Sequence, residues 1–264
     1  MKVALITGVA GGIGLATAKE LIANGYEVYG LDIRPVEEIE HLHFYQADLR
    51  SEEEIINAFN LINANNVKID FIIHCSGVYM LNSLVEMSEK DYLKIFDINV
   101  NGVYRINKAF LPLLNKGGKI IIITSELGDL DPLPFTGIYG ISKIALEKYA
   151  YSLRMELQLL NYQVVVIRPG AVATTLLNDS TTALDKFTEE TKLYSYNANK
   201  FKNIVDKVES KNTPPEKIAK LIYKVTTKKK PKYEYNINRN LGLKILNALP
   251  KRLQNYIIKK ILAK

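Results

Sequence analysis

Short apolar runs alternate along the chain with longer segments in which apolar residues recur at helical spacing. The runs are rich in Ile and Val and almost continuously apolar, which is typical of parallel strands covered on both faces. They fall at residues 2–7, 26–32, 41–46, 69–75, 118–124 and 163–168. The helical pattern falls at residues 13–24, 51–65, 88–115 and 137–161. This alternation predicts an α/β fold, a doubly wound parallel sheet with helices on both faces.

The regular pattern ends near residue 175. Residues 175–212 are polar, rich in Thr, Asn and Lys, and carry four aromatic side chains. A long irregular segment in a compact domain is often a lid or a binding loop, so we expect this one to close over a substrate. Residues 213–216 then open another helix, and residues 232–237 predict a last strand. No repeat or linker divides residues 1–264, which predict one domain.

Residues 240–264 form a basic tail. Apolar positions recur along it at helical spacing with lysines between them, and Pro250 divides it in two. This pattern predicts helices docked on the body or on a partner subunit. A basic amphipathic helix also suits a membrane surface, so both interpretations stay open. The apolar positions are Leu241, Ile245, Leu246, Leu249, Leu253, Ile257, Ile261 and Leu262.

The net charge of +7 is concentrated at the carboxyl end. Residues 201–264 hold 17 Lys and Arg against 4 Asp and Glu, whereas residues 1–200 are net acidic. A basic surface can attract nucleic acid, an anionic membrane or an acidic protein. No helix-turn-helix or zinc pattern accompanies it, so we expect no nucleic acid partner. No histidine or cysteine has a partner at metal-ligand spacing, and we expect no metal site.

Cysteine usage and hydropathy bear on the compartment. The chain has 264 residues, of which 47% are apolar, enough for one substantial core. The single cysteine, Cys75, excludes an internal disulfide framework and suits a reducing compartment. The first residues lack the pattern of a signal peptide, and no apolar run approaches the roughly 20 residues that cross a bilayer. These features predict a cytoplasmic protein.

A glycine-rich turn separates the first predicted strand from the first predicted helix. Its sequence is Thr7-Gly8-Val-Ala-Gly-Gly12-Ile13-Gly14. Gly8 permits a tight turn, Gly12 lets the backbone approach a phosphate, and Gly14 allows close packing of helix and strand. The helix that begins near Ile13 points its free N–H groups at a pyrophosphate. A dinucleotide site of the Rossmann type is therefore predicted.

Two acidic residues at strand ends bear on the choice of dinucleotide. Asp32 ends the second strand, where a carboxylate accepts hydrogen bonds from the adenosine ribose hydroxyls and repels a 2′-phosphate. It therefore favours NAD over NADP. Arg34, two residues later, complicates this preference. Its side chain has two alternative partners, the Asp32 carboxylate, which it would neutralise, and the 2′-phosphate of NADP. Asp48, after the third strand, is placed either to contact the adenine amino group or to cap a turn.

The pattern Tyr-x-x-x-Lys has chemical meaning only at one of its four occurrences. Tyr139 follows a strand that ends in Thr124-Ser125, and it precedes a long helix that leads to another buried strand. Strands of this fold deliver ligand-binding residues at that point. The four pairs are Tyr104/Lys108, Tyr139/Lys143, Tyr196/Lys200 and Tyr256/Lys260.

We expect Ser125, Tyr139 and Lys143 to act together in proton transfer. Spacing of four residues puts Tyr139 and Lys143 on one helix face. A close ammonium and a positive nicotinamide favour the phenolate, and so lower the phenol pKa from its usual value near 10. Lys143 can also hold the nicotinamide ribose, and Ser125 can hydrogen-bond the substrate oxygen.

These motifs resemble the short-chain dehydrogenase/reductase superfamily, single-domain branch, over residues 1–175. The glycine turn matches its cofactor turn, and Ser125, Tyr139 and Lys143 match its catalytic residues. The resemblance implies an NAD(P)-dependent enzyme, with Asp32 marking preference for NAD. It also implies homodimers or homotetramers joined through the helices at 88–115 and 137–161.

The resemblance adds further site residues. Asn99 matches the family asparagine that holds a water joining Lys143 to solvent. The segment Pro169-Gly170 to Thr174 matches the one that grips the nicotinamide carboxamide. The family sequence Asn-Ala-Gly after the fourth strand is replaced here by His74-Cys75-Ser76-Gly77, with Gly77 kept at the cofactor. This departure concerns the asparagine that steadies the central sheet.

The tail resembles members similar to hydroxysteroid and retinol dehydrogenases, which suggests a hydrophobic substrate. We therefore expect an NAD-dependent oxidoreductase that transfers a hydride between nicotinamide and a hydrophobic secondary alcohol or ketone, with Tyr139 as general acid/base. One alternative is an NADP-dependent reductase of carrier-linked β-ketoacyl groups, whose acidic carrier the basic tail would attract. Another is a non-catalytic dinucleotide-binding regulatory protein.

Overall fold

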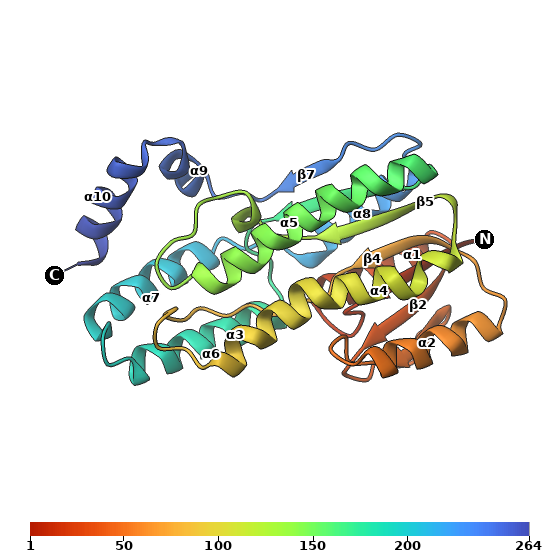
Figure 1. Ribbon diagram of the computed structural model, residues 1–264, viewed down its shortest axis with the longest axis horizontal. Coiled ribbons are helices and arrows are strands. Elements are labelled where there is room, and N and C mark those ends of the chain that lie inside the picture. The colour runs from red at the N-terminus through yellow and green to blue at the C-terminus, as the bar shows by residue number, and fades with distance from the viewer. Residues whose placement is uncertain (264) are drawn as a thin grey trace.

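A seven-stranded parallel sheet forms the centre of the molecule (Figure 1). The computed structural model describes the backbone of residues 1–263 and the side chains of residues 1–174 and 182–263. The strand order is β3-β2-β1-β4-β5-β6-β7. The chain adds β2 and β3 on one side of β1 and then returns to add β4 to β7 on its other side, so the order of the strands reverses between β1 and β4. Ligands of such sheets bind at this reversal, beyond the carboxyl ends of the strands. The predicted doubly wound α/β fold is confirmed. The strands are β1 (Lys2–Thr7), β2 (Tyr26–Asp32), β3 (Leu42–Gln46), β4 (Ile69–His74), β5 (Leu114–Ile123), β6 (Gln163–Pro169) and β7 (Glu234–Ile237).

Helices cover both faces of the sheet. One face is packed against α2, α4 and α5, and the other against α1 and α8. The helices are α1 (Gly12–Ala23), α2 (Glu52–Ala64), α3 (Glu89–Phe96), α4 (Gly102–Phe110), α5 (Gly137–Leu157), α6 (Thr175–Glu190), α7 (Ser195–Glu209), α8 (Pro215–Thr227), α9 (Leu241–Ala248) and α10 (Lys251–Leu262). Ser51 caps α2 by accepting a hydrogen bond from the Glu54 backbone N–H, and Ser88 caps α3 in the same way through Asp91.

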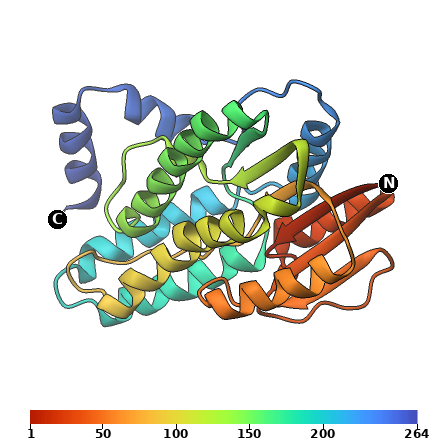
Figure 2. The same ribbon diagram turned by 45° about the vertical axis from the view of Figure 1, so that its right-hand side comes forward.

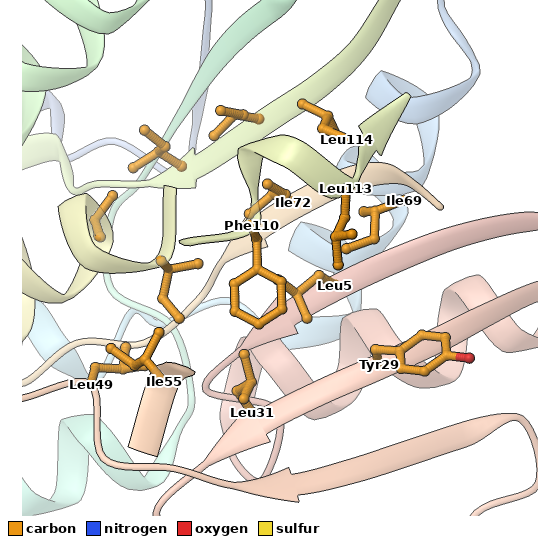
Figure 3. Close-up of a cluster of buried hydrophobic side chains, with 14 of the residues drawn as sticks. Leu5, Tyr29, Leu31, Leu49, Ile55, Ile69, Ile72, Phe110, Leu113 and Leu114 are labelled. Carbon is orange, nitrogen blue, oxygen red and sulfur yellow. The ribbon is translucent and has the colours of Figure 1, made fainter. Parts of the chain in front are cut away.

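The inner strands β1, β2, β4, β5 and β6 are largely apolar because each of them contributes to two hydrophobic cores, whereas the edge strands β3 and β7 are more polar. Successive side chains of a strand point to opposite faces. In β5, Ile120 and Ile122 join the core under α4, whereas Ile121 and Ile123 join the core under α1. Figure 3 shows the first core, where the ring of Phe110 lies among Leu5, Ile72 and other aliphatic side chains.

The segment at 88–115 is not the single helix that its apolar spacing predicts. It consists of α3, a π-helical turn η1 (Asp97–Asn101), α4 and a 3₁₀ turn η2 (Leu111–Leu113). β5 then begins at Leu114, earlier than predicted, and its pairing with β4 is irregular near that end. The polar and glycine residues at 115–118 hid this part of the strand from the sequence pattern.

The expectation of an irregular segment at 175–212 is also wrong. It folds into α6 and α7, which pack together over a third, smaller core. Phe135 lies at its centre, with ring centroids 5.0 Å from Phe187, 5.3 Å from Tyr194 and 5.4 Å from Phe201. Phe135 has a φ of 64°, which is unusual for a bulky residue. The core also contains Leu81, Leu184, Ala198, Val205 and Leu262.

The tail forms two short helices that dock on α7 and its surroundings. Leu262 of α10 joins the third core, and its carbonyl oxygen accepts a hydrogen bond of 2.7 Å from Asn197 Nδ2. The corner between α9 and α10 is held by Gln254, whose amide nitrogen donates to the carbonyl oxygens of Asn247 and Leu249. Within residues 1–263, no helix is long and apolar enough to span a membrane.

Phe110→Ala should lower the free energy of unfolding by about 3–5 kcal/mol, because a fully buried ring leaves a cavity in the first core. The change also removes an edge-to-face contact with Phe59 at 5.6 Å. Chemical denaturation measures the difference. Leu159→Ala, at a side chain that is 79% exposed, serves as the control and should change stability by no more than about 0.5 kcal/mol. Equal effects of the two substitutions would contradict the packing described for this core.

Candidate active site

The glycine-rich turn is folded so tightly that side chains would collide in it. Gly8 has a φ of 75°, and a Cβ there would lie 2.7 Å from the backbone nitrogen of Ser76. A Cβ on Gly14 would lie 2.0 Å from the Gly8 carbonyl oxygen. The expected close approach at Gly14 is therefore to the turn itself rather than to the strand. The Ala10 N–H donates to Asp32 Oδ2 at 3.0 Å, which ties the turn to the end of β2.

A groove with the features of a dinucleotide site runs over this turn. We call it the cofactor groove; the predicted cofactor residues that line it are Gly8, Gly12, Ile13, Asp32, Asp48, Gly77 and Thr174. A Cβ on Gly12 would lie 2.6 Å from Thr174 Cγ2, so only glycine fits between the turn and the segment after β6. Free N–H groups at the start of α1 supply the positive end of a helix dipole. The residues present therefore fit a bound pyrophosphate.

Acidic and basic side chains are paired at the adenosine end of the groove. Asp32 Oδ1 accepts a hydrogen bond from the Arg34 backbone N–H at 3.0 Å, and the Arg34 side chain lies 3.8 Å from the same oxygen. Arg50 holds Asp48 through both carboxylate oxygens, and these hydrogen bonds keep the pKa of Asp48 below its usual range. Sequence reasoning missed Arg50, although its place two residues after Asp48 matches that of Arg34 after Asp32.

Ser125, Tyr139 and Lys143 lie together beyond the carboxyl end of β5. Ser125 follows the strand, and its side chain is near enough to that of Tyr139 on α5 to lower the pKa of the phenol. Lys143 lies one turn further along α5, with its Nζ 5.6 Å from the centroid of the Tyr139 ring. The same ammonium donates to the carbonyl oxygen of Ile123 at 3.4 Å. All three predicted catalytic side chains are buried.

Burial controls the protonation of this group. It raises the pKa of Tyr139 to about 12, and the neighbouring Ser125 side chain opposes that shift only in part. It lowers the pKa of Lys143 to about 8, against the attraction of Glu147. The expected shift of the phenol towards neutrality is thus not produced by the protein's own groups. A nearby positive charge would have to supply it.

Asn99 lies in the π-helical turn, behind Lys143. Its Oδ1 accepts from the Val78 N–H at 2.8 Å, and its Nδ2 donates to Val78 O at 3.0 Å and to Ser142 Oγ at 3.1 Å. A Cβ on Gly77 would lie 3.3 Å from Asn99 Oδ1 and 3.5 Å from Lys143 Nζ. Because Gly77 has no side chain, Asn99 Oδ1 and Lys143 Nζ can both lie close to its backbone.

The replaced Asn-Ala-Gly sequence is accommodated by new contacts. His74 is buried, and its Nε2 lies 2.8 Å from Asn107 Oδ1 on α4. Burial lowers the pKa of His74 to about 4, so the ring is neutral. Burial also raises the pKa of the Cys75 thiol to about 12, which makes Cys75 a poor nucleophile. Among the residues with described side chains, no cluster of metal ligands occurs.

A buried ion pair that the sequence analysis did not identify lies beneath the catalytic side chains. Arg168, at the end of β6, binds both oxygens of Glu147 on α5 at 2.8 and 2.9 Å. Thr124 donates to Glu147 Oε1 at 2.6 Å, and Arg168 also reaches Glu234 of β7 at 2.7 Å. The sequence signal for this ion pair was Glu147 itself, a charged residue four positions after Lys143 on a helix face that is otherwise buried.

A second cavity adjoins the cofactor groove and contains the catalytic side chains. This catalytic cavity shares Ile13, Cys75, Ser76, Gly77 and Thr174 with the groove, and Pro169 and Gly170 line it. Its outer wall is apolar. The wall consists of Tyr79, Leu127, Leu133, Phe201, Ile204, Val205, Val208 and Leu243. α7 supplies four of these residues, from the segment 175–212 that we expected to close over a substrate, and α9 supplies Leu243, which the sequence analysis did not place at the site.

Tyr79 and two carboxyl groups complete the catalytic cavity. The Tyr79 ring lies 4.5 Å from that of Tyr139, and burial together with Glu209 raises its pKa. Glu126 follows Ser125 directly, and its Oε2 accepts a hydrogen bond of 2.6 Å from the Asn240 backbone N–H. Burial raises the pKa of Glu126. Sequence reasoning missed these residues because loop and tail contacts bring them together.

Comparisons with known proteins place this geometry in a family. The family model for short chain dehydrogenase matches residues 2–185. The chain is 26% identical to 3-ketodihydrosphingosine reductase from Bacteroides thetaiotaomicron, over 98% of this chain and 97% of that protein. It is 30% identical to NADPH-dependent 1-acyldihydroxyacetone phosphate reductase from Saccharomyces cerevisiae, over 66% of this chain and 62% of that protein.

A solved structure shares the fold. The crystal structure of a short chain dehydrogenase family protein from Francisella tularensis superposes with a TM-score of 0.76 at 24% identity, and covers 93% of this chain and 99% of that one. The family match covers more than half of the chain, including the glycine turn and the Ser125, Tyr139 and Lys143 group. The chain therefore belongs to the short-chain dehydrogenase/reductase family of oxidoreductases.

Proposed function

We propose that this protein is an NAD-dependent oxidoreductase that transfers a hydride between nicotinamide and a hydrophobic secondary alcohol or ketone. The observation that carries the proposal is that the cavity containing Tyr139 meets the cofactor groove, at residues that include Ile13, Gly77 and Thr174. The catalytic cavity contains Ser125, Tyr139 and Lys143, and it opens through shared residues into a groove shaped for a dinucleotide. Substrate and cofactor would thus meet beside one phenol.

Each side chain has a role that follows from its position. Tyr139 exchanges a proton with the substrate oxygen, and Ser125, which lies near Tyr139, orients that oxygen. Lys143 would hold the nicotinamide ribose through its buried ammonium. A bound oxidised nicotinamide supplies the hydride acceptor and a positive charge that favours the phenolate. Asn99 completes a proton relay behind Lys143, past the space left by Gly77.

The wall of the catalytic cavity supports a hydrophobic substrate. Its outer residues are aliphatic or aromatic, and α7 and α9 close over it in the manner expected of a lid. The Bacteroides relative is a 3-ketodihydrosphingosine reductase, and its name is consistent with a ketone substrate for this chain.

The charges in the cavity weigh against an anionic substrate. Among its described lining residues, two carboxyl groups, Glu126 and Glu209, stand against one ammonium, Lys143, and there is no arginine. A phosphate or a carboxylate would therefore lack a partner there and meet like charge. This favours a neutral alcohol or ketone over the alternative of a carrier-linked β-ketoacyl substrate. A purely regulatory dinucleotide-binding protein would have no use for the buried Lys143, which is costly to bury.

Preference for NAD rests on Asp32. The carboxylate lies at the end of β2 beside the turn, where it can accept hydrogen bonds from ribose hydroxyls. Arg34 and Arg50 also line the groove, but each is next to a carboxylate that offsets its charge. The yeast relative is NADPH-dependent by name, so both cofactors have to be compared.

We also propose a cytoplasmic homodimer or homotetramer. Exposed apolar side chains lie on α4 and α5, the helices through which the family resemblance predicts assembly. Among them, Tyr104 and Tyr151 are about half exposed, at 50% and 51%. Large apolar side chains at this exposure suit an interface between subunits.

Tyr139→Phe should reduce turnover at least a hundredfold, because the variant lacks the hydroxyl that exchanges the substrate proton. NADH binding should stay within about threefold of wild type, because the ring and its packing remain. Absorbance of reduced nicotinamide with a panel of hydrophobic secondary alcohols and ketones measures turnover, and nicotinamide fluorescence measures binding. Normal turnover by the variant would exclude the proposed mechanism.

Asp32→Ala should raise kcat/KM with NADPH relative to NADH by about tenfold or more, because the carboxylate no longer repels a 2′-phosphate. Arg34→Ala is the matched control and should leave the NADH value nearly unchanged. Steady-state kinetics with both cofactors measure the ratio. An unchanged ratio for Asp32→Ala, together with loss of NADPH use in Arg34→Ala, would assign the protein to NADP.

Lys143→Met should abolish turnover yet stabilise the fold near neutral pH. Because burial lowers the pKa of Lys143 to about 8, its charged form is costly in the folded protein. Removing that cost should raise the free energy of unfolding by roughly 1–3 kcal/mol below pH 8. The unfolded chain binds the proton more tightly, so wild type gains stability from pH 8 to 10.5 and the difference should shrink there. Denaturation at several pH values measures it; a difference that does not depend on pH would contradict the buried ammonium.

A further inference from the structure

We propose that α9 and α10 form a docking surface for an anionic lipid bilayer, which goes beyond the proposed function. The surface, called the tail surface here, combines exposed apolar side chains with unpaired basic ones on two short helices. The apolar members are Leu241, Ile245, Leu253, Tyr256 and Ile261. The basic members are Lys244, Arg252, Lys259 and Lys260.

The apolar side chains project into solvent although the helices are docked. Leu241 is 69% exposed and Ile245 57%, one helical turn apart on α9, and Tyr256 on α10 is 60% exposed. The inner face of α10 already contributes Gln254 and Leu262 to the body. The exposed apolar residues therefore take no part in packing the tail against the body. Tyrosine and aliphatic side chains at the end of an amphipathic helix suit insertion at the level of lipid headgroups.

The charge of the tail surface selects an anionic partner. Residues 240–264 contain six Lys and Arg and no Asp or Glu. Lys251 is bonded to Asp131, whereas the four basic members form no ion pair with any described residue. Each lysine or arginine near an anionic membrane contributes about 1 kcal/mol of attraction. Residues 1–200 are net acidic, whereas residues 201–239 are also basic, with 11 Lys and Arg against 4 Asp and Glu; the tail differs from them in having no acidic residue.

The surface is held rigidly, so docking needs no folding. Asn240 caps α9 by accepting from the Leu243 N–H, and its own N–H donates to Glu126. Asn247 Oδ1 accepts a hydrogen bond of 2.8 Å from the Asp131 N–H. Figures 1 and 2 show the two helices at the outer edge of the molecule, where a flat surface can reach them.

The tail surface and the catalytic cavity share helix α9, on different sides of it. Leu243, on the same helix as Leu241 and Ile245, lines the cavity that contains Tyr139. A hydrophobic substrate dissolved in a bilayer would therefore enter the protein next to the docked helices. This last step rests on the proposed function, whereas docking itself does not.

A second copy of the chain is a poorer occupant of the surface. A symmetric contact would bring two surfaces of the same positive sign together, and like charges at an interface cost several kcal/mol. An acidic protein would satisfy the lysines but not the five apolar side chains between them. Only an anionic bilayer offers negative headgroups with an apolar layer beneath.

Vesicle sedimentation with the full chain tests the proposal. The protein should pellet with vesicles of phosphatidylcholine and phosphatidylglycerol, less so at high salt, and only weakly with phosphatidylcholine alone. The triple change Lys244→Glu, Lys259→Glu and Lys260→Glu should reduce binding tenfold or more. The matched control reverses three exposed lysines before β7, Lys229→Glu, Lys230→Glu and Lys232→Glu, and should bind within about threefold of wild type.

The apolar half of the surface needs its own variants. Leu241→Ser with Ile245→Ser should weaken vesicle binding at least fivefold, whereas Leu159→Ser with Leu160→Ser, exposed at the end of α5, should not. Thermal melts and NADH binding establish that every variant is folded. These readouts do not require turnover, so the docking proposal and the proposed activity fail separately.

Four results would overturn the proposal. The first is no binding of wild type to anionic vesicles at low salt. The second is equal loss in the tail and control variants. The third is binding to soluble polyglutamate as tight as to vesicles and unaffected by the serine changes, which would indicate an acidic protein partner. If wild type self-associates through this surface, light scattering would show the serine variants as smaller, and a second copy would be the occupant.

Discussion

The ion pair between Glu147 and Arg168 is the interaction on which the site depends. It links α5 to the ends of β5, β6 and β7, directly below Lys143 and Tyr139. Such a pair adds little net stability compared with apolar residues, but loss of one partner strands a buried charge at a cost of about 3–5 kcal/mol. Its value is in geometry, because the carboxylate in the third turn of α5 is bonded both to Thr124, next to Ser125, and to Arg168 at the end of β6. The catalytic side chains therefore keep their spacing while the cavity beside them is open to ligands.

The price of that arrangement is a group of polar side chains held out of water. Lys143, Tyr139, Glu126 and His74 are all buried, and burial shifts each of their pKa values in the direction that favours the neutral form. The apolar sheet surrounds these groups and offsets their cost through two continuous cores. At the carboxyl edge of the sheet, burying these titratable groups lowers the stability of the fold. The same burial shifts their pKa values, on which proton transfer depends.

Much of this could be predicted from the sequence because the signals are local. Continuous apolar runs such as Ile120–Ile123 identified the strands, and the glycine turn with Tyr139 and Lys143 identified the two ends of the site. What was missed depends on contacts between distant segments. Glu126 and Leu243 meet only because the tail folds back over β5, and Tyr79 reaches Tyr139 from a loop. Helix α7 was hidden for another reason: Ala198, Phe201, Val205 and Val208 have helical spacing, but the polar residues between them outnumber them.

Phe135 joins two parts of the molecule that would otherwise be independent. Its ring is the hub for α6, α7 and the turn between them, while its backbone, in the left-handed region, lies two residues before α5 begins. A bulky residue adopts that conformation only where its surroundings enforce it. The rings of Phe187, Tyr194 and Phe201 supply that enforcement, so a movement of α6 and α7 away from Phe135 would release the backbone at the start of the helix that holds Tyr139. Any such movement would therefore also alter the position of the Tyr139 hydroxyl.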